Sequence, residues 1–178
     1  NYYTAIEQFL ACAGELGGNK LYRTDAIQYA ALYLASKADM LLEAANWADL
    51  YGAREEAYDC AMRIEELLLD ADRLLASHPL LRLDRWSGMA RRAGCTEEEK
   101  ERFVGESRRL ISVWGGPSLS DYSARVWSGV IRDYYVPRLN KYLEAKTDGI
   151  VFDFRTWDEQ WHASRTVSRV EPFADPLA

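Results

Sequence analysis

The chain has 178 residues, a hydrophobic content of 48% and a formal net charge of -6, so it is long enough to bury a core and is not expected to be disordered. The acidic balance, without a block of Lys or Arg, disfavours nucleic acid or an anionic membrane as a partner. Charges break the apolar runs well short of the ~20 residues that span a bilayer. Composition therefore predicts one globular domain over residues 1–178.

The chain begins at Asn1 without a basic or apolar leader, which favours a mature product or an excised piece of a longer protein. Its three cysteines, Cys12, Cys60 and Cys95, lack the Cys-x-x-Cys spacing of a zinc or redox site. Cys12 and Cys60 fall at helical core spacing, so we expect small buried residues rather than a disulfide. The redox compartment stays open.

Apolar residues recur every three or four positions in the first half of the chain, which predicts three helices. The first covers Tyr3 to Leu16. The second begins near Thr24, which is predicted as its N-cap, and ends at Gly52. The third, Arg54 to Ser77, is the most regular, and its predicted inner face is Ala57, Ala61, Ile64, Leu68, Ala71 and Leu75.

His78-Pro79 ends the third helix, because the residue before a proline is pushed out of the α region. A shorter helix follows until Gly94, with Leu83, Trp86, Met89 and Ala90 on its inner side. Thr96 and Glu99 then have the spacing of a capping box, which predicts the start of a fifth helix. The inner side of that helix is predicted to hold Phe103, Ser107, Leu110, Ile111 and Trp114.

A turn is predicted at residues 115–118, Gly-Gly-Pro-Ser, since Gly and Pro cost about 1 and 3 kcal/mol in a helix relative to Ala. Ser118 or Ser120 is expected to cap a sixth helix, which Pro137 kinks or restarts. The predicted inner positions of this helix are Tyr122, Val126, Val130 and Tyr134.

The last part of the chain is predicted to be short and extended at Ile150–Phe154, then helical from a second capping box at Thr156–Glu159. No segment alternates with a period of two, so no strand is expected. The predicted fold is all-α, with six or seven mostly antiparallel helices and no sheet. The helical body covers about residues 1–147, and a short C-terminal helix with a tail covers residues 150–178.

The residues alone do not build an autonomous enzyme. A di-metal helical bundle needs two Glu-x-x-His motifs, and only Glu159 and His162 make one, because His78 has Leu75 where the glutamate is needed. No metal or cofactor is therefore predicted. The sequence holds no Gly-x-Ser-x-Gly nucleophile motif, and its acidic pairs are typical of solvated helix faces.

Aromatic residues are abundant at 12% of the chain. Trp86, Trp114 and Trp161 are expected to be core rings. Asp121 and Tyr122, at the predicted helix start, are open to two interpretations: a helix-capping charge with a core ring, or a ring and hydroxyl that hold a polar ligand.

Several spaced motifs resemble the C-terminal helical domain of alpha-N-acetylglucosaminidases, glycoside hydrolase family 89. The resemblance extends from about Tyr22 to Trp161. The motifs are Tyr22-Arg23-Thr24-Asp25, Leu67 to Ala76, Leu83-Asp84-Arg85-Trp86, Ala90-Arg91, Trp114-Gly115, Asp121-Tyr122, Arg125, Trp127-Ser128-Gly129 and Asp133-Tyr134-Tyr135-Val136-Pro137-Arg138.

The resemblance implies a retaining exo-hydrolase of terminal α-linked N-acetylglucosamine glycans, with two catalytic glutamates on a (β/α)8 barrel. A chain of 178 residues has room only for the helical domain, so no catalytic residue is assigned. The resemblance implies that Leu119, Asp121 and Tyr122 wall the sugar pocket. It also implies supporting or domain-docking roles for Tyr22, Arg23, Asp25, Trp114, Arg125, Trp127 and Arg138.

By resemblance the parent is secreted, periplasmic or lysosomal-type, and the excised chain is expected to be inactive and to dimerise through its uncovered docking face. The chain departs from the family pattern at Ser123, Ala124, Val126 and Leu139, which leaves the linkage and aglycone open. The alternatives are a free-standing helical module with an aromatic protein-binding face, and an independent carbohydrate-binding module.

Overall fold

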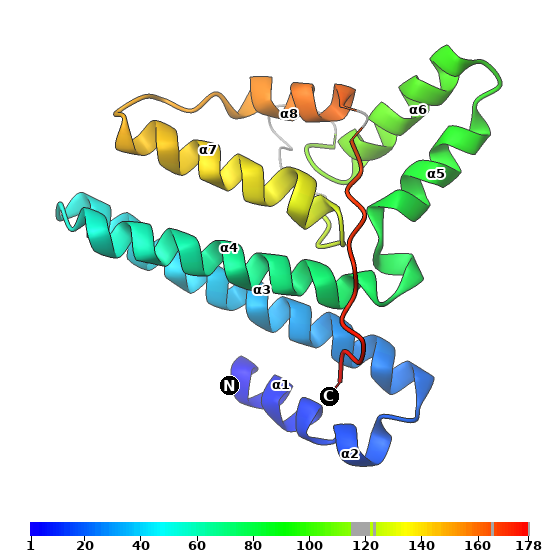
Figure 1. Cartoon of the computed structure of the whole chain (residues 1–178), viewed down its shortest axis with the longest axis horizontal. Helices are drawn as coiled ribbons and strands as arrows, with labels where there is room; N and C mark the ends of the chain where they lie inside the picture. Colours follow the sequence, from blue (N-terminus) through cyan, green and yellow to red (C-terminus); the bar gives the residue numbers. More distant parts are fainter. Residues whose placement is uncertain (115–121, 123, 165, 178) are drawn as a thin grey trace. The chain divides into compact units, whose positions relative to one another are not determined.

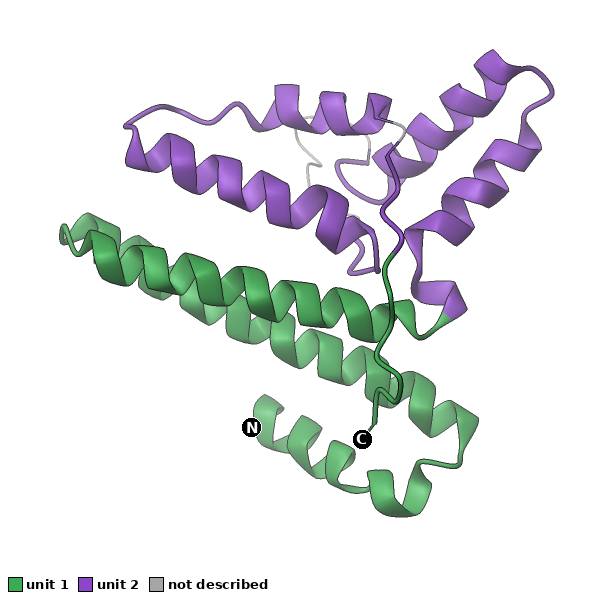
Figure 2. Ribbon diagram, viewed as in Figure 1, with its two compact units in different colours: residues 1–78, 170–178 green, residues 79–169 purple. Residues whose placement is uncertain are grey.

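The computed structural model describes residues 1–114, 122, 124–164 and 166–177. The chain forms two compact units (Figure 2): residues 1–78 with 170–178 are unit 1, and residues 79–169 are unit 2. The described residues form helices, turns and irregular segments without a strand, which confirms the predicted all-α class. None of the described helices is both long enough and apolar enough to span a bilayer.

Unit 1 is built on two long helices. Its elements are α1 (Tyr2–Ala11), α2 (Ala13–Leu16), α3 (Lys20–Leu50) and α4 (Arg54–Ala76). Helices α3 and α4 lie side by side (Figure 1), and Gly52 in the turn between them has a φ of 78°, a conformation that favours glycine. The predicted third helix, Arg54 to Ser77, is confirmed to within one residue, since Ser77 is the C-cap of α4.

Small side chains bring α3 and α4 close together. Four alanines of α3 are almost fully buried: Ala26, Ala31, Ala38 and Ala45. The predicted inner face of α4 is confirmed at Ile64, Ala71 and Leu75. Burial of these apolar side chains, at roughly 25 cal/mol per Å² removed from water, is the main stabilising contribution of the helix pair.

Helix α3 begins earlier than predicted. The Oδ1 of Asn19 accepts from the amides of Leu21 and Tyr22 at 2.9 and 3.4 Å, so Asn19 is the N-cap. Thr24 lies inside the helix, where its hydroxyl donates to the carbonyl of Lys20 at 3.0 Å. The prediction of Thr24 as N-cap was wrong because Asn caps a helix at least as well as Thr and comes first along the chain.

The first predicted helix is interrupted at Cys12, which is the C-cap of α1 and lies exposed. The prediction that Cys12 is buried was wrong, because α1 ends there and a C-cap is not held against the core. Cys60 is half-buried on α4, and all three cysteines are free thiols.

Unit 2 contains the shorter helices. Its elements are the 3-10 turn η1 (Pro79–Leu81), α5 (Leu83–Ala93), α6 (Glu97–Leu110), the π-helical turn η3 (Ile131–Tyr135), α7 (Val136–Thr147) and α8 (Phe154–Ala163). Its core consists of Leu83, Val130, Tyr134 and Trp161, which come from α5, from η3 with the residue before it, and from α8. The restart at Val136 agrees with the predicted effect of Pro137.

Of the two predicted capping boxes, the first is confirmed. The amide of Glu99 donates to the Thr96 hydroxyl at 3.2 Å, and the Glu99 carboxylate accepts from the Thr96 amide at 3.2 Å. The second was wrong: Asp153 caps α8 by accepting from the amide of Thr156 at 3.1 Å. Asp153 lies just before the first helical residue, which places Thr156 already in the first turn.

The predicted sixth helix was wrong in its first part, since residues 124–127 are irregular. Ser128 instead pairs with the segment before α5: its amide donates to Leu81 and its carbonyl accepts from Leu83, at 2.8 and 2.9 Å. Gly129 then has a φ of 86°, so a helix cannot pass through it. Val130 and Tyr134 are buried as predicted. Ser118, Ser120 and the turn at residues 115–118 lie outside the described residues.

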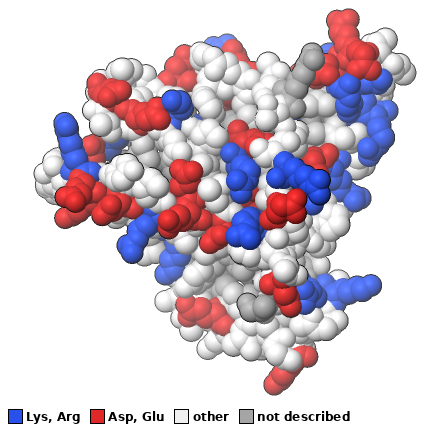
Figure 3. Space-filling view, viewed as in Figure 1, with Lys and Arg blue, Asp and Glu red and all other residues white. Residues whose placement is uncertain are grey.

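Four predicted inner positions are exposed: Met89, Leu110, Trp114 and Tyr122. The side chain buried instead on α6 is Arg108, which is 0% exposed. On the face of the molecule shown in Figure 3, acidic and basic side chains are interspersed. Neither acidic nor basic side chains alone cover that face, in keeping with the small net charge of -6.

Candidate functional site

An exposed pair of stacked rings stands at the end of α6. The rings of Trp114 and Tyr122 have centroids 5.1 Å apart at an interplanar angle of 19°. Trp114 is 41% exposed and Tyr122 is 71% exposed. We call these two residues the aromatic pair. The expectation that Trp114 is a core ring was wrong, and of the two interpretations of Tyr122 the core ring was wrong as well, because both side chains are exposed.

Trp114 has an unusual backbone conformation. Its φ is 54°, the only positive value for a non-glycine residue in the described part of the chain. Its amide donates to the carbonyl of Arg109 at 2.7 Å, which closes the turn after α6. A bulky residue in the left-handed region costs roughly 1–2 kcal/mol, and such residues gather at functional sites. Strain and exposure therefore coincide at one ring.

A buried guanidinium lies behind this turn. Arg108 Nη1 donates to the carbonyls of Trp161, at 2.9 Å, and Ser164, and its Nη2 donates to the carbonyl of Thr166 at 2.8 Å. The carbonyl of Trp161 also accepts from the amide of Ser164 at 3.1 Å, so Arg108 adds a second donor at the end of α8 and reaches two carbonyls beyond it. Burial lowers the pKa of Arg108, while the negative charge of Asp133 acts in the opposite direction.

A serine and a histidine continue this arrangement. The hydroxyl of Ser112 donates to the carbonyl of Arg108 at 2.8 Å, and its oxygen lies 2.9 Å from His162 Nε2. His162 is 5% exposed. Burial, followed by the charge of Arg109, lowers the pKa of His162 to about 4, so the ring is neutral near pH 7. We call Arg108, Ser112 and His162 the polar cluster.

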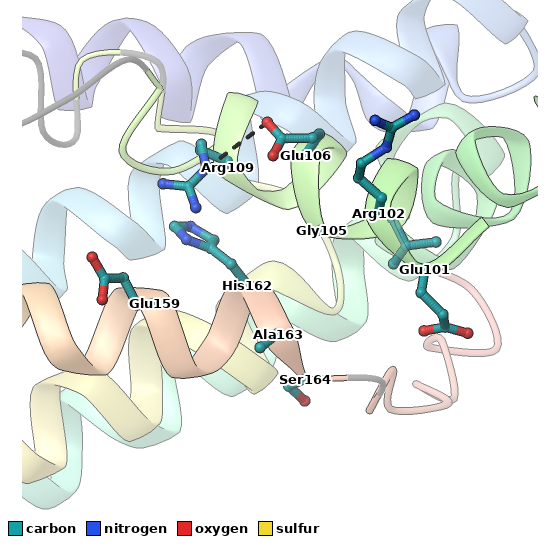
Figure 4. Close-up of a pocket in the computed structure, with 10 residues that line it drawn as sticks. Glu101, Arg102, Gly105, Glu106, Arg109, Glu159, His162, Ala163 and Ser164 are labelled. Carbon is teal, nitrogen blue, oxygen red and sulfur yellow. Dashed lines mark ion pairs between the residues drawn. The ribbon is translucent and has the colours of Figure 1, made fainter. Parts of the chain in front are cut away.

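A hollow of about 310 Å³ opens beside His162, between α6 and α8. Figure 4 shows the imidazole pointing toward the guanidinium of Arg109, which is 3.9 Å from the carboxylate of Glu106. The charged and titratable side chains of its lining are Glu101, Arg102, Glu106, Arg109, Glu159 and His162. In the described part of the chain, no three His, Cys, Asp or Glu residues are grouped to hold a metal ion.

The Asp133-to-Arg138 motif joins α7 to α8 and to the segment after it. The hydroxyl of Tyr134 donates to Asp158 Oδ1 at 2.6 Å, and Arg138 donates to both oxygens of that carboxylate at 3.0 and 3.3 Å. Asp133 Oδ2 accepts from the amide of Ser168 at 2.8 Å. Such charge-assisted bonds fix orientation as well as adding stability. Arg138 therefore lies inside unit 2, against Asp158.

The other site residues predicted in unit 2 have different surroundings. Trp127 stacks on Trp86 with centroids 5.7 Å apart and packs on the core. Arg125 is exposed, and its amide donates to the carbonyl of Ile111 at 3.1 Å, which ties the returning chain to the turn after α6. Leu119 and Asp121 lie outside the described residues.

The site residues predicted in unit 1 bind the ends of that unit together. The hydroxyl of Tyr22 donates to the carbonyl of Phe9 at 2.8 Å, and the two rings stack at 4.8 Å. Arg23 donates to the carbonyl of Gly17 and pairs with Asp175 of the tail, both at 3.2 Å. Asp25 is exposed.

Sequence reasoning missed the polar cluster and Asp158. Arg108 and Arg109 have the pattern of a basic helix end, which is normally solvated, and Asp158 was taken as part of a capping box. The one available signal was that His162 lies on the same helix as two tryptophans, Trp157 and Trp161. Periodicity alone does not distinguish an arginine that caps a neighbouring helix from one that faces water.

Two solved structures of the family 89 glycoside hydrolase from Clostridium perfringens are similar to this chain. One, in complex with 2-acetamido-1,2-dideoxynojirmycin, has a TM-score of 0.84 and 25% identity, and the match covers 98% of this chain and 22% of that one. The other, a variant in complex with its substrate GlcNAc-α-1,4-galactose, has a TM-score of 0.83 with the same identity and coverage.

The human alpha-N-acetylglucosaminidase is 34% identical over 86 residues, which are 48% of this chain and 12% of the human protein. The chain thus spans only a small part of each relative. The family model for the alpha-N-acetylglucosaminidase (NAGLU) C-terminal domain matches residues 1–178. The chain belongs to the alpha-N-acetylglucosaminidase C-terminal domain family.

Proposed function

We propose that the whole chain, residues 1–178, is the accessory domain of an exo-acting, retaining alpha-N-acetylglucosaminidase. It would pack on a (β/α)8 catalytic barrel of the same parent protein and wall the sugar pocket of that barrel. Support comes from the family model over the full chain and from the amino-sugar compounds named with the bacterial relatives. In keeping with the resemblance, the parent would be secreted, periplasmic or lysosomal-type.

The aromatic pair is the observation that carries this proposal. Stacked rings that remain exposed present an apolar face together with the phenolic hydroxyl of Tyr122. A pyranose offers the complementary surface, since its C–H faces are apolar and its rim is polar. Leu119 and Asp121 would belong to the same wall, since they lie between the two rings in the sequence.

The supporting residues are proposed to act through the fold. Arg138, through Asp158, holds α8 in place, and Trp127 packs on the core of unit 2. Arg125 is proposed to dock on the barrel or to rim the pocket. Tyr22, Arg23 and Asp25 are proposed to support or dock unit 1.

Unit 1 also has an exposed apolar surface that suits docking on the rest of the parent. Trp47 and Tyr51 stack at 6.1 Å, and Leu50, Tyr51 and Tyr58 are each at least 65% exposed. Interfaces between domains of one chain bury about 600–1,500 Å². The excised chain should therefore self-associate through this surface. Sedimentation velocity should detect a dimer of the wild type and a weaker dimer, or none, of Trp47→Ser.

The pocket role is tested by Tyr122→Ala in the full-length parent. Loss of a stacked ring is worth about 0.5–1.5 kcal/mol beyond the lost area, so kcat/KM on an aryl α-N-acetylglucosaminide should fall about 10-fold or more. Tyr2→Ala is the matched control, because Tyr2 is also an exposed ring in contact with a neighbouring ring, at 5.5 Å from Tyr3. The excised chain should show no turnover.

Equal kcat/KM for Tyr122→Ala and the parent would reject the pocket role. Turnover by the excised chain would reject the division of labour between domains. Sugar affinity of the excised chain, measured by calorimetry with N-acetylglucosamine, would instead favour an independent carbohydrate-binding module.

A further inference from the structure

We propose that the polar cluster positions the aromatic pair, so that Arg108, Ser112 and His162 are positioning residues of the candidate site. This inference rests on the proposed function of the pair. It assigns a role to three buried side chains that contact no ligand in that proposal.

The first step is the short path between the cluster and the pair. Ser112 lies in the same turn as Trp114, two residues before it. The amide of Trp114 donates to the carbonyl of Arg109, the residue after Arg108, at 2.7 Å. A strained backbone persists only where its surroundings over-determine it. The φ of 54° at Trp114 therefore requires that the turn be held, and the polar cluster holds it.

The second step is the anchor of the cluster. The guanidinium of Arg108 reaches three carbonyls at and beyond the end of α8, at Trp161, Ser164 and Thr166. Gly105 allows this close approach, because a Cβ there would lie 3.2 Å from the carbonyl oxygen of His162. The last turn of α6 and the end of α8 therefore form one rigid part, from which Trp114 projects.

The third step is the direction of the hydrogen bonds. The single hydroxyl proton of Ser112 is donated to the carbonyl of Arg108. The Nε2 of His162 must then carry the proton in the 2.9 Å contact with Ser112 Oγ. This tautomer leaves Nδ1 as a bare acceptor, and Nδ1 is buried without a hydrogen-bond partner.

Protonation of His162 disturbs this arrangement. It would place a new N–H on the buried Nδ1 and a positive charge near Arg108 and Arg109 of α6, which Glu106 and Glu159 offset only in part. A buried donor without an acceptor costs about 1–3 kcal/mol. The turn that carries Trp114 should therefore loosen in acid, with a midpoint near the His162 pKa of about 4.

The experiment uses the full-length parent labelled with 5-fluorotryptophan, with Trp114→Phe to assign the Trp114 resonance. His162→Gln keeps an N–H donor at a similar reach and removes the titration, whereas His162→Phe removes the donor. Ser112→Ala removes the hydroxyl. Ser107→Ala is its matched control, since Ser107 lies on α6 and its hydroxyl donates to the Val104 carbonyl within that helix, at 2.7 Å.

At pH 6.5 we expect His162→Phe and Ser112→Ala to shift or broaden the Trp114 resonance and to lower kcat/KM about 10-fold or more, since small misplacements of a site can cost up to about 100-fold. His162→Gln and Ser107→Ala should keep the wild-type resonance and kcat/KM within about threefold. Between pH 6.5 and 3.5 the Trp114 resonance of the wild type should move, and that of His162→Gln should not.

An unchanged Trp114 resonance in His162→Phe and Ser112→Ala would overturn the inference, as would the same pH response in the wild type and His162→Gln. If a variant fails to fold, the titration of the wild type against His162→Gln still decides. If Tyr122→Ala leaves turnover intact while His162→Phe moves the resonance, the proposed function fails and the positioning role stands.

Discussion

The burial of His162 predicts how the stability of unit 2 depends on pH. The folded state keeps the imidazole neutral down to about pH 4, whereas the unfolded chain binds a proton below about pH 6.5. Between these values the unfolded state holds more protons, so acid favours unfolding. The contribution of His162 to stability is therefore complete above pH 6.5 and is lost as the pH falls toward 4.

The size of the effect follows from the two pKa values. Each unit of pKa difference is worth about 1.4 kcal/mol, so a fall from 6.5 to about 4 sets a ceiling of roughly 3 kcal/mol. At pH 5 the unfolded state is already largely protonated and the folded state is not. Linkage then gives a loss of about 2 kcal/mol between pH 7.5 and pH 5.

Urea unfolding of the 178-residue chain, followed by tryptophan fluorescence at pH 7.5 and 5, measures this loss. His162→Gln removes the titrating group, so its free energy of unfolding should fall about 2 kcal/mol less than that of the wild type over this interval. Ser112→Ala is the control: it should be less stable at both pH values and should keep the wild-type pH dependence, because the imidazole stays buried.

The carboxylates of the chain contribute the same pH dependence to every variant, so the difference between variants isolates His162. If the wild type and His162→Gln lose stability equally between pH 7.5 and 5, the ring is not held neutral in the folded state. The assignment of Nδ1 as a bare acceptor would fall with it.

Two further predictions concern the helices that support the site. Asp158→Ala removes the partner of Tyr134 and Arg138 and leaves a largely buried guanidinium without this carboxylate, so urea unfolding should show a loss of about 3–5 kcal/mol; a loss below 1 kcal/mol would contradict the assigned contact. Thr96→Ala removes the hydroxyl that accepts from Glu99 and should cost about 1 kcal/mol. Thermal unfolding followed by circular dichroism would detect the lower Tm, and an unchanged Tm would show that the capping box contributes nothing.

The sequence was sufficient for the elements that local rules determine. The period of α4, the proline after it and the Thr96 capping box depend on residues within a few positions of one another, so they could be predicted in place. The Thr24 and Thr156 caps were wrong for a local reason too, because a better acceptor, Asn19 or Asp153, precedes each of them. Local patterns are more reliable for predicting that a helix begins in a region than for predicting which residue caps it.

The candidate site depends on distant contacts, which local patterns do not contain. The predicted sixth helix does not extend over residues 124–127, and Ser128, which follows them, instead pairs with Leu81 and Leu83. These partners lie more than forty residues earlier in the chain. Tyr122 lies exposed, outside the core. Family resemblance predicts a pocket role for Tyr122 from its motif, but it gives no indication of the polar cluster.

The conformation of Trp114 connects the fold with the proposed function. Glycine would occupy a φ of 54° without strain, and a ring that is 41% exposed contributes little to the core. Stability alone therefore gives no reason for a tryptophan at this position. The strain is held by a turn that Ser112 and Arg108 fasten to α8, so part of the folding energy of unit 2 maintains the presentation of one exposed ring. A strained backbone that presents an exposed ring is expected where the ring contacts something outside this chain.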